Sequence, residues 1–233
     1  MEREEGMRIL AREGWLSATP VDFQRAILSR CTWKHLETGD RITAGGEQTG
    51  DLIGLAHGTI ELTTVLGVSE TPMMHLGYPV FWLGYGPIMS GQPRRISANA
   101  KSAVWLASVP QTTVIGLLRE RPEWWQHFLP LALEYGDIAI NIAADMLIRG
   151  SERRCAAALL RLCGRRFPEL EDAAPAEIPI SQDELAAAAN LSRNTTGDVL
   201  RKLAARGLIE LGYRCMIVRA PTALRAFVEQ NHN

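Results

Sequence analysis

The stretch that most constrains the fold of this chain runs from residue 181 to residue 219 and contains two short helices separated by a turn. The first helix opens with Ser181 and Glu184, which have the S-x-x-E spacing of a capping box. Asn190 is a typical turn residue, and Ser192 can cap a second helix whose N-terminal N–H groups are able to hold a phosphate. These signals predict a helix-turn-helix near the C-terminus.

The second helix of this pair has one apolar and one polar face. Its apolar stripe falls at i, i+3, i+4 and i+7 and consists of Thr196, Val199, Leu200 and Leu203. Its outer face is expected to carry Arg193, Asn194, Gly197, Asp198 and Arg201. Gly207 ends the helix, and "LIELGYRCMIVRA" follows as two strands around Gly212 and Tyr213. The added hairpin predicts a winged helix-turn-helix.

Charge supports a nucleic-acid contact only locally, because the formal net charge of the chain is −1. Residues 1–150 hold 13 basic and 16 acidic residues, whereas residues 151–233 hold 12 and 10. Between Arg193 and Arg219 there are six basic and two acidic residues, a net charge of +4. Such a basic stretch indicates a weak electrostatic footprint for nucleic acid, and a solvated helix face is the alternative.

The N-terminal half has the pattern of a small β-domain. Glycine recurs through residues 39–115, and the runs between the glycines, such as "TIELTTVL", alternate apolar and polar residues. Many short strands with glycine turns predict a small barrel or double sheet. A short helix is expected before it, within residues 15–38, with Phe23, Ile27 and Leu28 on its apolar face.

A long helix is predicted over residues 121–149, with Pro122 near its start and Gly150 after its end. One apolar seam follows alternating steps of four and three residues and consists of Trp125, Leu129, Ala132, Gly136, Ala139, Ala143 and Met146. A second seam consists of Phe128, Leu131, Tyr135, Ile138 and Ile142. Two seams predict two partners, namely the helix's own domain and a second copy of the chain. The alternative is a helix buried within one monomer.

Other function classes find little support in the sequence. The four cysteines form no metal-binding cluster, no catalytic constellation is recognisable, and neither a signal peptide nor a membrane-spanning run is present. We therefore expect a cytoplasmic protein that is not an enzyme, with no metal site and no membrane contact. The sequence does not identify a cofactor, and none of His35, His57, His75 and His127 lies in a pattern that indicates haem.

The segment "SRNTTGDVLRKLAARGLIE" resembles the DNA-binding helix of the Crp/Fnr (cyclic-AMP receptor protein) family, in which a Ser-Arg-Glu-Thr-Val run leads into a Leu-rich helix and "GLI". The chain departs from that run at Asn194, where the family has Glu, and at Asp198, where it often has Arg. The DNA-binding residues that we expect are Ser181, Ser192, Arg193, Asn194, Thr195, Asp198 and Arg201.

The two departures change what the helix can recognise. Arg193 can donate bidentately to guanine, and Asn194 suits adenine better than Glu would. Asp198 can accept a hydrogen bond from cytosine but repels phosphate. We favour the alternative that Asp198 steadies Arg201 or Lys202 and touches no base.

The resemblance extends to the N-terminal half and so covers nearly the whole chain. Gly39, then Gly46 with Glu47, and later Gly58 are similar to the family's glycine pattern for a β-roll. The resemblance implies an α+β fold with three parts. They are a cyclic-nucleotide-binding-like β-roll at residues 1–120, of the double-stranded jelly-roll type, a dimerisation helix at 121–150 and a winged helix-turn-helix at 151–233.

The effector pocket departs further from the family pattern. Alignment on Arg94 puts Gly84 where nucleotide-binding members have a ribose-binding Glu, and Arg95 where they have Ser. Asn141 falls near the family's purine-binding pair on the dimer helix. Arg94 and Arg95 could still clamp an anion, or they could form a surface pair beside a turn. We therefore expect weak or no cyclic-AMP binding, and either a different effector or an empty roll.

Together these features predict a homodimeric transcription regulator of the Crp/Fnr type. Its expected partners are a near-palindromic DNA duplex, a second copy of itself, RNA polymerase and a small-molecule effector whose identity the sequence does not give. The alternative is a ligand-binding or protein-interaction module of the same fold that has lost sequence-specific DNA binding.

Overall fold

The computed structural model describes residues 2–48, 50–64, 72–166 and 175–230. Their contacts divide the chain into two compact units, Met1–Thr71 with Leu76–Asp137, and Pro72–His75 with Ile138–Asn233. The boundaries between the units fall within the long helix α6 (Leu129–Leu147) and within β5 (Met73–Gly77), which is described below with the sheets of the first unit. We describe each unit separately.

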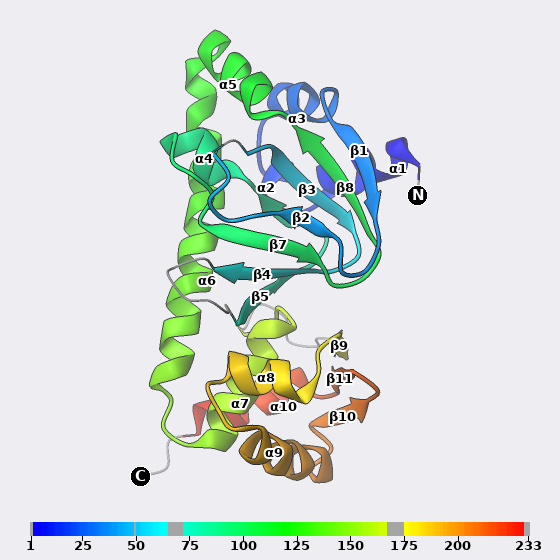
Figure 1. The fold of residues 1–233 in the computed structure, drawn as a ribbon, viewed down its shortest axis with the longest axis vertical. Coiled ribbons are helices and arrows are strands. Elements are labelled where there is room, and N and C mark those ends of the chain that lie inside the picture. The colour runs from blue at the N-terminus through cyan, green and yellow to red at the C-terminus, as the bar shows by residue number, and fades with distance from the viewer. Residues whose placement is uncertain (1, 49, 65–71, 167–174, 231–233) are drawn as a thin grey trace. The chain divides into compact units, whose positions relative to one another are not determined.

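The first unit is a β-roll with accessory helices, as Figure 1 shows. Its helices are α1 (Arg3–Arg12), α2 (Gly14–Ser17), α3 (Val21–Leu28), α4 (Tyr85–Ser90), α5 (Gln111–Glu120) and the 3₁₀ helix η1 (Pro122–Phe128). Its strands are β1 (Thr32–Leu36), β2 (Arg41–Thr43), β3 (Leu52–His57), β4 (Ile60–Thr64), β5 (Met73–Gly77), β6 (Trp82–Leu83), β7 (Ile96–Ala100) and β8 (Val104–Val109). They form two four-stranded sheets, ordered β1-β8-β3-β6 and β2-β7-β4-β5. The predicted α+β fold with a β-roll is confirmed, although the first strand begins before Gly39.

Aromatic residues hold the helices of this unit together. The predicted apolar face of α3 is buried, with Phe23 and Ile27 at 0 % exposure. Phe23 packs edge-on against Trp124 and Phe128, with ring centroids 5.3 and 6.0 Å away. Such pairs add to the stabilisation that burial of the rings provides. The start of the predicted long helix is thereby fixed to the roll.

The predicted continuous helix over residues 121–149 is wrong in its first turns. Residues Pro122–Phe128 form the 3₁₀ helix η1, and the α-helix α6 begins at Leu129. The indole Nε1 of Trp15 donates to the carbonyl oxygen of His127 over 2.5 Å. The indole thus bonds a carbonyl group that a regular α-helix would bond internally, which is compatible with the tighter turn at this point.

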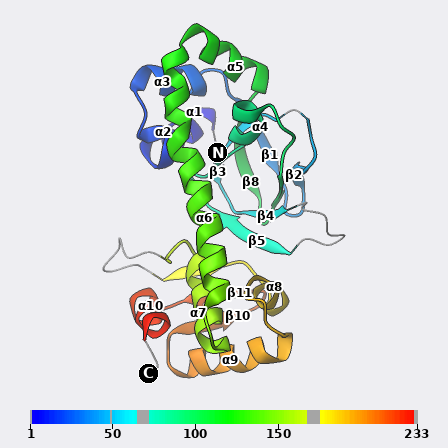
Figure 2. The same cartoon turned by 90° about the vertical axis from the view of Figure 1, so that its left-hand side faces the viewer.

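The second unit carries the predicted winged helix-turn-helix, whose elements Figure 2 shows in a second view. Its further elements are α7 (Ser151–Leu162), β9 (Ala176–Ile178), α8 (Gln182–Ala188), α9 (Arg193–Ala205), β10 (Ile209–Gly212), β11 (Cys215–Val218) and α10 (Pro221–Glu229). The three strands form one antiparallel sheet in the order β10-β11-β9. The apolar residues of α7, α8, α9 and α10 form the core under this sheet.

A buried ion cluster joins the end of α6 to α7 within this unit. The carboxylate of Asp145 is 0 % exposed and accepts a 3.0 Å hydrogen bond from the Nε atom of Arg161 and another from that of Arg166. Arg161 also donates to the carbonyl oxygen of Ala188 at the end of α8. Removal of one partner from such a cluster leaves an uncompensated buried charge, which is strongly destabilising.

Candidate nucleic-acid interface and effector cavity

The helix α8 begins with the predicted capping box. The backbone N–H of Glu184 donates to the Oγ of Ser181 over 3.3 Å, and the backbone N–H of Ser181 donates to the Glu184 carboxylate over 2.7 Å. The Ser181 hydroxyl also donates to that carboxylate over 2.8 Å. The cap therefore engages the Ser181 side chain, which orients α8.

The helix α9 begins with the second predicted cap. The backbone N–H of Thr195 donates to the Oγ of Ser192 over 3.1 Å, and the two hydroxyl groups lie 2.8 Å apart. The predicted inner stripe is buried, with exposures of 0–2 % at Thr196, Val199, Leu200 and Leu203. This burial fixes which face of α9 turns outwards.

The outer face of α9 matches the prediction except at one position. Arg193, Asn194, Asp198 and Arg201 are exposed, whereas Gly197 is buried. A Cβ atom on Gly197 would lie 3.5 Å from the Oε1 of Gln182, the first residue of α8. Because α8 covers this position, Gly197 is buried although Asn194 and Arg201, one turn away on the same face, are exposed. The exposed residues border a shallow hollow lined by Gln182, Arg193, Asn194, Gly197, Asp198 and Arg201.

Acidic residues pair with the cations of this face. The Nε of Arg193 lies 3.2 Å from the Asp183 carboxylate, and the Arg201 guanidinium pairs with Asp198. Lys202 pairs instead with Glu152 over 2.6 Å. Of the two partners suggested for Asp198, the structure therefore shows Arg201 and not Lys202. The hydrogen bond from Lys202 holds the pKa of Glu152 below its usual range.

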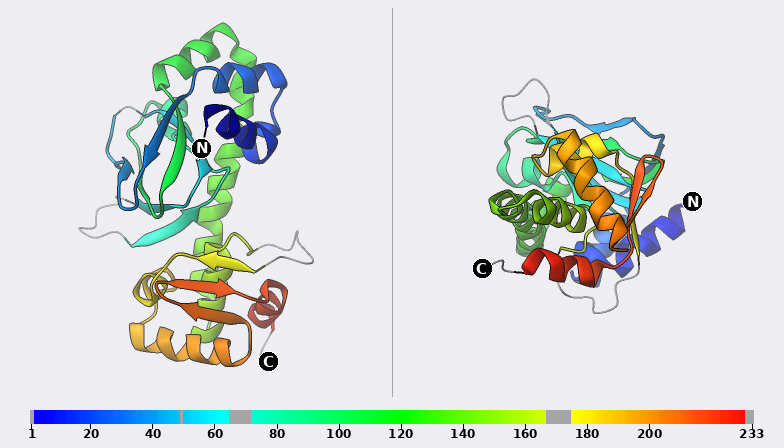
Figure 3. Two further views of the ribbon diagram at one scale, coloured as in Figure 1. Left: turned by 90° about the vertical axis from the view of Figure 1, so that its right-hand side faces the viewer. Right: turned by 90° about the horizontal axis from the view of Figure 1, so that it is seen from below.

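The sequence reasoning missed the tip of the wing as a candidate site. Figure 3 shows the orange hairpin of β10 and β11 in two further views. The strands pair up to Gly212 and Cys215, so that Tyr213 and Arg214 form a two-residue turn. Tyr213 is 92 % exposed, and Arg214 has a φ of 54°. The sequence signal for this site was the segment "LGYRC", which places an aromatic residue and an arginine at the tip of a predicted hairpin.

Three of the four predicted effector residues occupy one region of the first unit. A cavity of about 150 Å³ is lined by Leu83, Gly84, Tyr85, Gly86, Pro87, Ser90, Pro93, Arg94, Arg95, Ile96 and Tyr135. Asn141 lies on the part of α6 that belongs to the second unit, and it does not line this cavity. The volume is well below the roughly 300 Å³ at which pockets for drug-sized ligands begin.

Arg94 is neither a free anion clamp nor a surface residue. Its side chain is 5 % exposed, its Nη2 donates to the carbonyl oxygen of Asp51 over 2.8 Å, and its Nε lies 3.4 Å from the Glu47 carboxylate. Burial lowers the pKa of the guanidinium, and the charges of Glu47 and Asp51 oppose that shift. Arg95 is exposed and remains the cation of this region that faces solvent.

The backbone at Gly84 leaves no room for a side chain. Gly84 has a φ of 98°, and a Cβ atom there would lie 1.9 Å from the carbonyl oxygen of Asp51. No side chain fits this position without a shift of the backbone. An acidic side chain at residue 84 is therefore incompatible with this backbone.

Comparison with known proteins agrees with this geometry. Residues 153–227 match the model of the Crp-like helix-turn-helix domain. A CRP/FNR family transcriptional regulator from Thermus thermophilus is 24 % identical, with a TM-score of 0.62 over 85 % of this chain and 99 % of that one. FixK2 from Bradyrhizobium japonicum is 16 % identical, with a TM-score of 0.71 over 87 % and 99 %. No curated protein matches the chain in sequence.

The chain therefore has a β-roll followed by a winged helix-turn-helix, an arrangement that it shares with solved CRP/FNR transcriptional regulators. More particularly, residues 153–227 are a Crp-like helix-turn-helix domain, and the chain has the fold of the Crp/Fnr regulators. Among the described helices, none has both the length and the apolar character that crossing a bilayer requires.

Proposed function

We propose that the protein is a homodimeric transcription regulator that inserts the N-terminal end of α9 into the major groove of DNA. The observation that carries the proposal is the exposure of Arg193 and Asn194 in the first turn of a helix that belongs to a Crp-like domain. Their side chains suit guanine and adenine respectively, and the capped helix N-terminus beside them favours a phosphate. Arg193 can exchange the exposed carboxylate of Asp183 for a base, because such a surface pair contributes little to stability.

Asp198 acts in this proposal through Arg201 and not through a base. The pair spans one turn of the exposed face, and it holds the Arg201 guanidinium along the helix. Asp198 therefore weakens the electrostatic attraction of α9 to DNA phosphates. It also limits the orientations that the Arg201 side chain can adopt. Arg214 at the wing tip adds a cation that can contact the backbone beside the groove, with Tyr213 next to it.

Dimerisation through α6 is supported by an apolar stripe that lies open on the helix. Leu129, Leu133, Ile140 and Leu147 are 60, 60, 65 and 82 % exposed. With the exposed Gly136 and Ala143 they follow steps of four and three residues, the spacing of a coiled-coil seam. This stripe shares Leu129, Gly136 and Ala143 with the first seam expected from the sequence. Its other members, Leu133, Ile140 and Leu147, each lie one residue after the corresponding members of that seam. A second copy of α6 would bury it and bring two α9 helices to one near-palindromic site.

The effector stays unidentified, and cyclic AMP fits poorly. The cavity at Gly84 and Arg95 is small, Arg94 is engaged by Glu47 and Asp51, and no acidic side chain can stand at residue 84. RNA polymerase as a partner rests on the resemblance alone. The alternative function is a ligand-binding or protein-interaction module without DNA binding. The acidic residues that pair with the cations of the outer face of α9 support this alternative.

A DNA-binding measurement separates the two functions. Fluorescence anisotropy of the full chain with random genomic fragments, followed by selection of the tightest binders, should yield a near-palindromic site with half-sites about one helical turn apart. Affinity should fall steeply as salt rises, because phosphate contacts release counterions. Absence of binding even at low salt would favour the interaction module.

A further inference from the structure

The tip of the wing carries a cation that differs from the other cations of the basic stretch between Arg193 and Arg219. Five of the six basic residues in this stretch pair with a carboxylate, and they are Arg193, Arg201, Lys202, Arg206 and Arg219. The sixth is Arg214, which is exposed. Among the described residues, its guanidinium has neither a hydrogen-bond partner nor a carboxylate within ion-pair distance. Arg214 is therefore the cation of this stretch that the described part of the chain leaves available to an anionic partner.

The backbone of the turn makes arginine an unfavourable choice at this position. Arg214 has a φ of 54°, in the left-handed region that residues with a Cβ atom rarely adopt. Glycine or asparagine would form the same turn with less strain. A residue held in such a conformation calls for a functional explanation, because strain of this kind gathers at sites of binding.

The strands below the tip hold it on a three-stranded sheet. β10 and β11 pair up to Gly212 and Cys215, and β11 also pairs with β9. At the other end of the hairpin, the carboxylate of Glu210 accepts a hydrogen bond from the guanidinium of Arg219 over 2.8 Å. The two turn residues therefore project from a paired base, and little order has to be gained when they bind a partner.

Tyr213 adds an apolar surface next to the free cation. It is 92 % exposed, the highest value among the exposed large hydrophobic residues of the described chain. An open aromatic ring beside an unpaired guanidinium suits a partner that is anionic and partly apolar. The minor groove of DNA has this character, because sugars form its walls, phosphates flank it, and arginine side chains insert into it.

The tip is connected to the helix that is proposed to lie in the major groove. β10 begins at Ile209, soon after α9 ends at Ala205, and the two elements contact each other within the second unit. We propose, on the basis of the proposed DNA-binding function, that Arg214 enters the minor groove next to the half-site that α9 reads. Tyr213 packs on the sugar–phosphate backbone at the edge of that groove.

This placement implies a sequence preference in base pairs that α9 does not touch. A·T-rich DNA has a narrow minor groove with an enhanced negative potential, which attracts arginine. The amino group of guanine projects into the minor groove and is absent from A·T pairs. The protein should therefore prefer A·T-rich DNA beside each half-site.

The test uses the full chain and three versions of the duplex selected in the DNA-binding measurement. They share both half-sites and differ in the base pairs on either side of each half-site, which are A·T, G·C or inosine·cytosine pairs. Inosine keeps the major-groove pattern of guanine but lacks its minor-groove amino group, so it distinguishes the two grooves. In fluorescence anisotropy, the A·T and inosine duplexes should each bind at least fivefold more tightly than the G·C duplex.

Variants at the tip assign this preference to one side chain. Arg214→Gly suits the turn but removes the guanidinium, and it should bring the three affinities within twofold of one another. Arg214→Lys keeps the charge, but because an ammonium is more strongly hydrated than a guanidinium, most of the preference should be lost. Tyr213→Ala should weaken binding to all three duplexes by a similar factor, because backbone contacts carry no sequence information. Arg219→Ala, the control, alters an arginine of the same hairpin that Glu210 already engages, and it should keep the preference.

Three results would overturn the proposal. They are equal affinity of the unaltered chain for the A·T and G·C duplexes, an inosine duplex that binds as weakly as the G·C duplex, and a preference that survives Arg214→Gly. The comparison of duplexes on the unaltered chain decides the matter even if a variant does not fold. A chain that binds no duplex at all would contradict the DNA-binding function itself. Selective binding of the half-sites without a preference beside them would contradict only the role of the wing.

Discussion

The carboxylate of Asp198 pairs with the guanidinium of Arg201 one turn further along α9, and both lie on the exposed face of the helix. An acid at this position therefore restrains a cation of the proposed DNA interface.

Replacement of that acid should strengthen general DNA binding. Asp198→Asn frees Arg201 for a phosphate, and Asp198→Arg adds a second cation. We expect the slope of log affinity against log salt to steepen by about one for each added contact. Fluorescence anisotropy on unrelated duplexes at several salt concentrations measures this. An unchanged slope in both variants would mean that this face does not approach the phosphates.

Arg193 should carry sequence preference. Arg193→Ala is expected to cost about 1–3 kcal/mol on the preferred site and little on unrelated DNA, because it removes a bidentate contact to a base. Binding to the selected site and to a scrambled one measures the difference. Arg219→Ala, which alters an exposed arginine paired with Glu210, is the control. If Arg193→Ala kept the same preferred site, the assignment of the reading face would be wrong.

The stripe on α6 should control the oligomeric state. Leu133→Glu with Ile140→Glu places two charges on the exposed seam, and we expect a monomer in analytical ultracentrifugation. Since both side chains are exposed in the single chain, its fold should persist. Asp137→Ala, on the same helix outside the stripe, should remain dimeric. A dimer that tolerates both glutamates must use another surface.

Gly84 should not accept a side chain. Gly84→Ala is expected to destabilise the roll by about 2 kcal/mol or more, because of its positive φ and the contact with the Asp51 carbonyl. At Gly86 a Cβ atom would meet nothing within 4 Å, so Gly86→Ala should be neutral or slightly stabilising. Urea denaturation compares the two. Gly84→Glu should also fail to create cyclic-AMP binding, which calorimetry checks.

His75 should make stability depend on pH. Burial, with the Arg161 charge as a smaller cause, lowers its pKa to about 4 from an ordinary value of 6.5. As the pH falls from about 6.5 to 4, His75 is protonated in the unfolded chain but stays neutral in the folded chain. The free energy of unfolding therefore decreases over that window. Above pH 6.5 the effect is absent. We expect the chain to lose about 2–3 kcal/mol relative to His75→Phe between pH 7 and pH 4, measured by denaturation at each pH.

The local elements of the DNA-binding unit could be predicted because their signals lie close together in the sequence. The caps at Ser181 and Ser192 and the stripe from Thr196 to Leu203 depend on spacings of three or four residues, and the structure has all of them. Gly197 was misjudged because α8, a separate element, covers it. Helix periodicity alone does not reveal such a neighbour.

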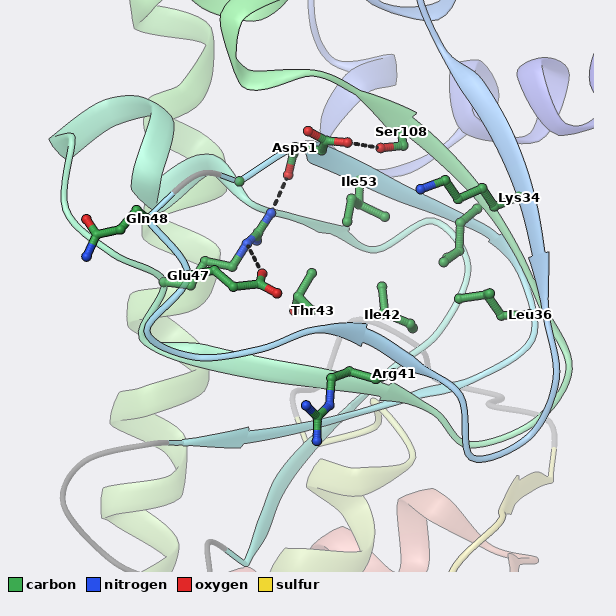
Figure 4. A pocket seen from close by; sticks show the side chains of 13 residues that line it. Lys34, Leu36, Arg41, Ile42, Thr43, Glu47, Gln48, Asp51, Ile53 and Ser108 are labelled. Carbon is green, nitrogen blue, oxygen red and sulfur yellow. Dashed lines mark hydrogen bonds and ion pairs between the residues drawn. The ribbon is translucent and has the colours of Figure 1, made fainter.

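The β-roll unit was less predictable because its details depend on contacts between distant residues. The 3₁₀ start of the long helix involves Trp15 and His127, which are 112 residues apart in the chain. The burial of Arg94 depends on Asp51 and Glu47, and no local pattern indicates that either would engage it. The cavity of about 430 Å³ between the two sheets (Figure 4) could not be predicted either, because it depends on β1 and β2 being edge strands of different sheets.

The cluster of Asp145, Arg161 and Arg166 has an evolutionary consequence. Loss of the single carboxylate would leave two guanidinium groups without this counter-ion, and loss of Arg161 would leave the buried carboxylate dependent on Arg166. Either change alone is expected to be strongly destabilising, so descendants of this chain should either retain the trio or exchange it jointly for apolar residues. In a set of homologous sequences, these three positions should therefore vary together.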